Sequence, residues 1–289
     1  MLPARFDYHR PGSLEEALSL LAEHGEDAKV LAGGQSLIPL MKLRFSAPGR
    51  LIDVNRVPGL DGIEERDGSL RIGALVRHNQ LAGSDVIKER YPTIAAAAPM
   101  IADPIVRNLG TIGGSLAHAD PSGDLGSVMI ALGGTVIARS SSGEREISAT
   151  ELAEGPFQSS LAPDELLTEV RVPSPGPRSG GTYLKMERKV GDFATVATAI
   201  FLTMDDGSIA TAGIGLTSVG LTNLRAEAAE AALAGATPGA ETFAEAGRLA
   251  AEASEPATDV RGSADYKRHV VDVFVRRGLA AAAEMAGAA

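Results

Sequence analysis

The chain has 289 residues and a formal net charge of −10, because 37 acidic side chains outnumber 27 Lys and Arg. This length predicts two domains, or one domain divided into subdomains, and the negative charge argues against binding to nucleic acid. Cysteine is absent, which excludes disulfides, thiolate zinc sites and iron–sulfur ligation within the chain, so any redox chemistry must be borrowed from a bound group.

The N-terminal segment lacks the long apolar stretch of a secretory signal. No apolar run elsewhere approaches the roughly 20 residues that a membrane-spanning helix needs. We therefore expect a cytoplasmic protein with no membrane span.

The first part of the chain alternates short strands with helices. A capping box at Ser13–Glu16 begins a helix that Gly25 ends. Short apolar runs predict strands over 28–31, 50–54, 70–74, 135–139 and 166–172. Helices are predicted over 37–41, with Ser36 as N-cap, over 93–98 and over 125–132, and a further helix is predicted to begin at a cap near Asn79.

A domain border is expected at Pro173–Gly181, where three prolines and three glycines fall within nine residues and interrupt regular structure. Beyond it, strands are expected over 182–186, 194–204 and 209–216, the last two joined as a hairpin at Asp205–Gly207. From Arg225 onward the alanine-rich composition predicts three helices. Strands followed by helices predict an α+β C-terminal part.

Two Gly-Gly motifs share a context of apolar residues before and a small hydroxyl residue after: Leu31-Ala-Gly-Gly-Gln-Ser36 and Thr111-Ile-Gly-Gly-Ser115. Glycine turns can bring backbone N–H groups close to an anion, and two such turns, about 80 residues apart, would suit a pyrophosphate held from both sides. The second motif is predicted to be a strand-like segment that leads into a Gly-Gly turn. In a chain with 33 glycines, each motif alone is better explained as a plain turn, and it is the matching context of the two that favours a binding role.

Other nucleotide and catalytic signatures do not fit. No G-x-G-x-x-G follows a strand, and no P-loop sequence occurs. His118 to Asp124 contains histidine, aspartate and serine, but it is too compact for a hydrolytic triad and offers no third metal ligand. Asp124 could accept hydrogen bonds from ligand hydroxyls or cap a helix, and Lys185–Lys189 could face a ligand or be a solvated charge run.

The chain resembles a known family in the segments Ala32–Arg44 and Arg107–Asp124, and in Lys185-Met-Glu-Arg-Lys-Val-Gly-Asp-Phe193. These segments are similar to those of the flavin-binding medium subunits of molybdenum hydroxylases, the xanthine dehydrogenase family. Medium chains of aerobic carbon monoxide dehydrogenases are closest in pattern. The resemblance extends over nearly the whole chain.

The resemblance implies an α+β protein made of a two-lobed FAD-binding domain of the vanillyl-alcohol-oxidase type and the C-terminal domain of carbon monoxide dehydrogenase flavoproteins. The first domain would cover residues 1–176, with lobes of about 1–57 and 58–176, and the second would cover 177–289. FAD would lie extended between the lobes, bound non-covalently.

The resemblance also implies a set of cofactor-binding residues. The two glycine motifs would hold the pyrophosphate, Asp124 would meet FAD hydroxyls, and Phe193 falls near the expected place of the flavin ring, where Tyr or Trp is usual in the family. The full expected set is Leu31, Ala32, Gly33, Gly34, Gln35, Ser36, Leu37, Ile101, Thr111, Ile112, Gly113, Gly114, Ser115, His118, Asp124, Leu167, Lys185 and Phe193. No catalytic acid or base and no metal ligand is expected on this chain.

By the same resemblance, the chain would pass electrons from a partner's [2Fe-2S] clusters through FAD to an external acceptor: a quinone, oxygen or NAD. A large subunit would carry the molybdenum cofactor and a small subunit the clusters, in a dimer of heterotrimers, cytoplasmic or membrane-associated only through the complex. Carbon monoxide is the expected substrate of the whole enzyme. The alternatives are an N-heterocycle or aldehyde hydroxylase subunit, a non-catalytic assembly protein of the same fold, and a free-standing flavin oxidase.

Overall fold

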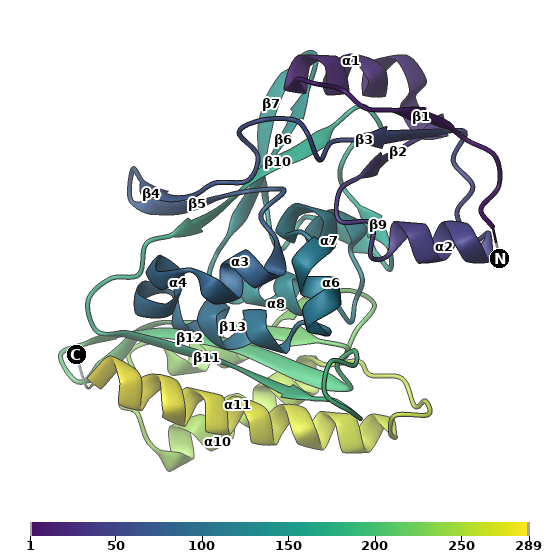
Figure 1. Ribbon diagram of the computed structural model, residues 1–289. Coiled ribbons are helices and arrows are strands. Elements are labelled where there is room, and N and C mark those ends of the chain that lie inside the picture. The colour runs from purple at the N-terminus through teal and green to yellow at the C-terminus, as the bar shows by residue number, and fades with distance from the viewer. Residues whose placement is uncertain (1, 288–289) are drawn as a thin grey trace.

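A computed structural model describes residues 2–287 and shows three main sheets. In Figure 1 the N-terminal sheet lies at the upper right and the five-stranded sheet at the upper left, short helices occupy the middle, and a four-stranded sheet backed by long helices forms the base. The mixed helix-and-strand architecture agrees with the expected α+β class.

The first sheet is small and parallel. Its strands are β1 (Asp7–His9), β2 (Ala28–Leu31) and β3 (Arg50–Asp53), in the order β1-β3-β2. The predicted first helix is α1 (Leu14–His24), where the Ser13 side chain accepts from the backbone N–H of Glu16 at 3.2 Å. Helix α2 (Leu37–Leu43) follows the first glycine motif, but the Ser36 side chain makes no capping hydrogen bond.

The second sheet is antiparallel, in the order β4-β5-β10-β6-β7. Its strands are β4 (Ile63–Arg66), β5 (Ser69–Gly73), β10 (Leu166–Pro173), β6 (Thr135–Ser140) and β7 (Gly143–Ser148), with a small hairpin, β8 (Ala153–Gly155) and β9 (Gln158–Ser159), beside them.

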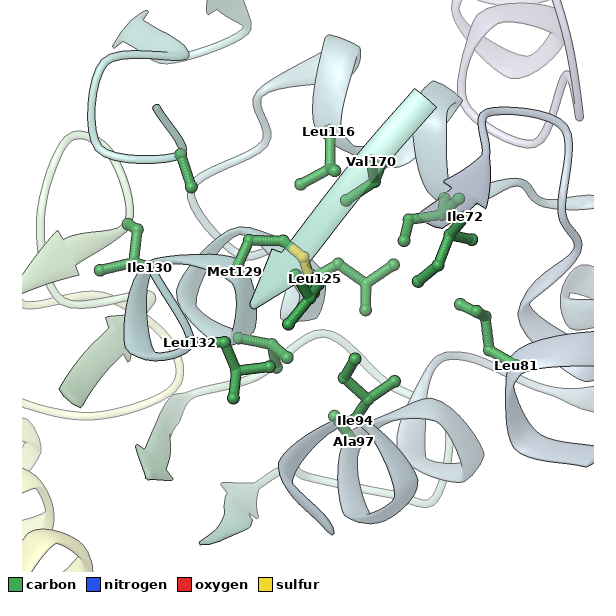
Figure 2. Packing of buried hydrophobic residues seen from close by; sticks show 14 of the residues in the cluster. Ile72, Leu81, Ile94, Ala97, Leu116, Leu125, Met129, Ile130, Leu132 and Val170 are labelled. Carbon is green, nitrogen blue, oxygen red and sulfur yellow. The ribbon is translucent and has the colours of Figure 1, made fainter. Parts of the chain in front are cut away.

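Six short helices accompany this sheet: α3 (His78–Gly83), α4 (Asp85–Arg90), α5 (Pro92–Ala97), α6 (Pro104–Leu109), α7 (Ile112–His118) and α8 (Asp124–Ala131). Figure 2 shows Ile72 and Val170 of the sheet among the helix side chains Leu81, Ile94 and Met129. Helix α3 has Arg77 as its N-cap, two positions before Asn79, near which a cap was expected, whereas neither α4 nor α6 was expected.

The third sheet, in the order β11-β12-β13-β14, carries the C-terminal helices. Its strands are β11 (Ser179–Met186), β12 (Val196–Asp205), β13 (Ser208–Thr217) and β14 (Leu224–Arg225), and the three helices are α9 (Glu227–Leu233), α10 (Ala240–Ala253) and α11 (Ala264–Gly287). The predicted hairpin and three helices are confirmed.

The expected interruption at Pro173–Gly181 is shorter than the sequence indicated. Strand β10 continues to Pro173 and β11 begins at Ser179, so Gly180 and Gly181 are strand residues. A Cβ on Gly180 would lie 2.0 Å from the Ala282 carbonyl oxygen of α11. Glycine is therefore required there by close packing between strand and helix rather than by a turn.

The two faces of the third sheet pack against different helices. Ile200 and Leu216 belong to the core shared with α10 and α11, whereas Ala199 and Gly215, which are paired across β12 and β13, face α8. A Cβ on Gly215 would lie 2.0 Å from the Ser127 carbonyl oxygen. The period-2 alternation of large and small residues thus lets α8 approach the sheet backbone closely.

No helix within residues 2–287 is both long enough and apolar enough to cross a bilayer.

Candidate functional site

The first glycine motif connects β2 to α2 and leaves a run of backbone N–H groups without protein acceptors. Gly34 takes a left-handed φ of +71°, and the Gln35 side chain donates to the Gly33 carbonyl at 3.1 Å. Within residues 2–287, the N–H groups of Gly33, Gly34, Gln35 and Ser36 donate to no other protein group. Consecutive unpaired N–H groups at the start of a helix attract an anion.

The second glycine motif differs from the expected strand-and-turn. Thr111 is the N-cap of α7, its hydroxyl accepts from the Gly114 N–H at 3.1 Å, and both glycines lie in the first turn of the helix. The N–H groups of Ile112 and Gly113 donate to the carbonyls of Val76 and Ala74, each at 3.0 Å. The expectation of a turn here is wrong, because Thr111 supplies a cap that begins a helix.

Gly113 is required by packing. A Cβ at this position would lie 2.5 Å from the Ala74 Cβ and 2.8 Å from the Ala74 carbonyl oxygen. The second motif is therefore fixed against the residue that follows β5, and the amides of Ile112 and Gly113 are already satisfied by protein carbonyls.

The two motifs lie side by side. A Cβ on Gly33 would lie 2.4 Å from the Leu109 carbonyl oxygen and 2.7 Å from the Gly110 Cα, and one on Gly114 would lie 3.7 Å from the Ala32 Cβ. The arrangement joins unpaired amides of the first motif to the N-terminal turn of α7. This cradle suits the two negative charges of a pyrophosphate, and a side chain at Gly33 would force the two motifs apart.

A second group of expected site residues lies around the start of α8. Asp124 is almost fully buried and accepts from the Tyr183 hydroxyl at 2.6 Å and from Lys185 Nζ at 3.1 Å. Lys185 also donates to the Met100 carbonyl at 3.0 Å. Burial raises the pKa of Asp124, and the Lys185 ammonium opposes that rise.

These contacts bear on whether Asp124 caps a helix or binds a ligand, and on whether Lys185 is a solvated surface charge. Asp124 is the first residue of α8, and its N-cap is Gly123, so its charge lies at the positive end of the helix without a side-chain cap. Lys185 is not a solvated surface charge, because its side chain is 1% exposed. Both Asp124 oxygens already have protein donors, so a ligand hydroxyl would share them.

Helix α6 connects the two groups. Its last residue, Leu109, contacts Gly33, and its N-cap, Asp103, follows Ala102, against which Gly191 of the Phe193 loop packs. Asp103-Pro104 is a capping residue followed by proline at the first helical position, a start signal that could have predicted α6 from sequence.

The remaining expected residues are dispersed. Ile101 and Leu167 are buried in the main core, and the His118 ring lies 5.1 Å from that of Phe157, with burial lowering its pKa. Phe193 is 53% exposed in the loop between β11 and β12. Leu31 ends β2 at the start of the first motif, Leu37 begins α2 directly after it, and Ser115 is half-buried in α7.

Three polar residues near the motifs were not singled out by the sequence analysis. Asn55 donates to the Ala32 carbonyl of the first motif, and Arg77 donates to the Leu109 carbonyl, two residues before the second. His78 is buried beside Gly110, and burial, reinforced by the charges of Arg107 and Arg77, lowers its pKa to about 4. No motif marks these residues, although Asn55 follows the end of a predicted strand. In the described part of the chain, no three His, Asp or Glu side chains form a group able to hold a metal ion.

Two family models match the chain. Residues 4–175 match the FAD binding domain in molybdopterin dehydrogenase, and residues 181–282 match the CO dehydrogenase flavoprotein C-terminal domain.

Individual relatives match over nearly their full length. The chain is 41% identical to the carbon monoxide dehydrogenase medium chain of Hydrogenophaga pseudoflava, covering 98% of both chains. It is 43% identical to 6-hydroxypseudooxynicotine dehydrogenase complex subunit alpha of Paenarthrobacter nicotinovorans, over 98% of this chain and 96% of that one. A solved structure of the Hydrogenophaga pseudoflava carbon monoxide dehydrogenase that lacks the Mo-pyranopterin moiety superposes with a TM-score of 0.96 at 44% identity, covering 99% of each chain.

Proposed function

Because the chain belongs to the FAD-binding medium subunits of the molybdenum hydroxylases, an oxidoreductase family, we propose that it holds FAD non-covalently between its two N-terminal lobes. The observation that carries the proposal is the meeting of the two glycine motifs, with the unpaired N–H groups of Gly33–Ser36 beside the first turn of α7. These amides would hold the pyrophosphate.

The rest of the cofactor would extend along α6 toward the second group of residues. There Asp124, held by Tyr183 and Lys185, would accept from a cofactor hydroxyl, and Ile101 and Leu167 would supply apolar contacts. Phe193, on an exposed loop, would lie near the flavin ring. We keep the domain borders at 1–176 and 177–289, with lobes of about 1–57 and 58–176.

Bound FAD would supply the electron-transfer chemistry, since it accepts electrons singly and delivers them singly or in pairs. The chain would serve as the electron-transferring subunit between a small [2Fe-2S] subunit and an external acceptor, in a cytoplasmic dimer of heterotrimers whose large subunit carries molybdenum. The absence of cysteine from the sequence supports this division, because clusters need thiolate ligands from another chain. Carbon monoxide is the proposed substrate of the complex.

A second candidate is an N-heterocycle hydroxylase subunit. The 43% identity to the 6-hydroxypseudooxynicotine dehydrogenase subunit is as high as that to the carbon monoxide dehydrogenase chain and supports this alternative. Assaying the purified native complex with carbon monoxide and with hydroxylated pyridines would separate the two.

The FAD-binding role is tested with the isolated chain. We expect it to carry yellow flavin absorption that is released on denaturation, and to take up FAD again after its removal. Gly33→Ala should abolish FAD uptake, because the new Cβ would meet the Leu109 carbonyl oxygen. Gly62→Ala is the control, since nothing lies within 4 Å of a Cβ there. A wild-type chain that takes up no FAD, or a Gly33→Ala chain that binds it normally, contradicts the proposal.

A further inference from the structure

Asn55 and Arg77 form a polar clasp between the regions that carry the two glycine motifs. Asn55 lies just after β3 of the first sheet, and Arg77 is the N-cap of α3 in the second lobe. We propose that this clasp is a positioning device that fixes the cradle before the cofactor binds. The inference rests on the proposed FAD-binding function.

The Asn55 amide holds the start of the first motif. Its Nδ2 donates to the Ala32 carbonyl at 2.8 Å and to Asp53 Oδ1 at 2.7 Å. Asp53 in turn accepts from the Tyr8 hydroxyl, so the amide is oriented by a carboxylate that is itself fixed. Because the Ala32 carbonyl shares its peptide plane with the Gly33 N–H, fixing the first fixes the direction of the second.

Arg77 connects this arrangement to the second motif. One terminal nitrogen donates to Asn55 Oδ1 at 2.6 Å, and the other donates to the Leu109 carbonyl. That carbonyl is the group that Gly33 approaches so closely that a Cβ would lie 2.4 Å from it. The guanidinium therefore bonds one side of this contact, Leu109, directly and the other side, through Asn55, indirectly.

The planar fork of Arg77 serves the two acceptors from two different nitrogen atoms. Arginine presents these donors in fixed directions, whereas the three donors of a lysine ammonium all leave a single atom at the end of a flexible stem. With both terminal nitrogens committed to protein oxygens, Arg77 acts on the amides of the cradle through Asn55 and Leu109. Without the clasp, the Gly33–Ser36 loop would have to be ordered during binding, which weakens affinity.

The test measures FAD affinity of the full 289-residue chain by flavin fluorescence, after removal of bound cofactor. Arg77→Met should weaken FAD binding by about 10- to 100-fold, the effect of losing hydrogen bonds to a charged group. Arg77→Lys should restore part of that affinity. The double variant Asn55→Ala/Arg77→Met should bind no more than about threefold more weakly than Arg77→Met alone, because both residues act through one clasp.

Arg171→Met is the matched control, since Arg171 is also partly buried in the second lobe and pairs with Glu146 and Glu169. It should leave FAD affinity unchanged while costing similar thermal stability in the flavin-free chain. If Arg77→Met does not fold, Asn55→Ala alone tests the clasp, and the same loss of FAD affinity is expected for it.

Wild-type FAD affinity in Arg77→Met or Asn55→Ala overturns the clasp and leaves the proposed function intact. If Arg77→Met and Arg171→Met lose the same FAD affinity, the clasp is also overturned, because lower stability alone would then explain the weaker FAD binding. A wild-type chain that binds no FAD overturns the proposed function and the clasp together.

Discussion

Glycine serves two different purposes in the two motifs that meet at the candidate site. Gly33 leaves room for the Leu109 carbonyl and stands at the head of a run of unpaired N–H groups. Gly113 lets α7 pack on Ala74, and its N–H is already bonded. The same residue type thus opens a ligand cradle in one motif and joins backbone to backbone in the other.

A buried histidine at residue scale gives the protein a defined acid sensitivity. His78 is 5% exposed, and its pKa of about 4 lies below the usual 6.5 because burial and the nearby cations Arg107 and Arg77 disfavour protonation. The unfolded chain therefore binds more protons between pH 6.5 and 4. Stability from neutral His78 is present above pH 6.5 and is lost as pH falls toward 4, by about 3 kcal/mol in all.

We expect the unfolding free energy of His78→Gln to fall less steeply between pH 6.5 and 4 than that of the wild type, measured by urea denaturation. His269→Gln, at an exposed position on α11, is the control and should follow the wild-type curve. Parallel curves for His78→Gln and the wild type would mean that His78 is not a source of acid sensitivity.

At the scale of elements, the start of α8 depends on strand β11. Lys185 reaches from the strand to Asp124 at the helix start, with both side chains shielded from water. Removing one partner of such a pair leaves the other charge uncompensated, which costs about 3–5 kcal/mol. The pair therefore fixes where the helix begins relative to the sheet.

Lys185→Met should accordingly destabilise the flavin-free chain by about 3 kcal/mol in urea denaturation, and Asp124→Asn/Lys185→Met should regain most of that loss. Lys189→Met, at an exposed site in the same segment, should change stability by less than about 0.5 kcal/mol. A loss below about 1 kcal/mol in Lys185→Met would show that Asp124 does not need this partner.

At the scale of the whole molecule, the third sheet lies between α5 and α8 on one face and α10 and α11 on the other (Figure 1). Small residues such as Ala199 and Gly215 let α8 contact the sheet backbone, and Thr217 bonds Ser127 across the same interface at 2.6 Å. The C-terminal part therefore supports helix α8 directly.

Gly215→Ala tests this interface. The added Cβ would lie 2.0 Å from the Ser127 carbonyl oxygen, so we expect a loss of about 3 kcal/mol and reduced hydrogen-exchange protection in α8. Gly239→Ala, with nothing within 4 Å of a Cβ, is the control. Unchanged protection of α8 in Gly215→Ala would contradict close packing between the sheet and this helix.

The sequence by itself determined features that depend on neighbouring residues. The α1 capping box, the β12–β13 hairpin and the three C-terminal helices follow from a cap, a turn and alanine-rich composition, which act within a few residues. The two glycine motifs and the family resemblance were equally visible.

Only the tertiary structure decided which polar groups are free and which are occupied. In the folded chain, the N–H groups of Ile112 and Gly113 donate to the carbonyls of Val76 and Ala74. Asn55 accepts a hydrogen bond from Arg77, 22 positions later in the chain, and Asp124 accepts one from Lys185, 61 positions later. Local patterns cannot specify such partners, because packing of distant elements brings them together. The spare hydrogen-bonding capacity that defines a binding site is therefore a property of the folded molecule.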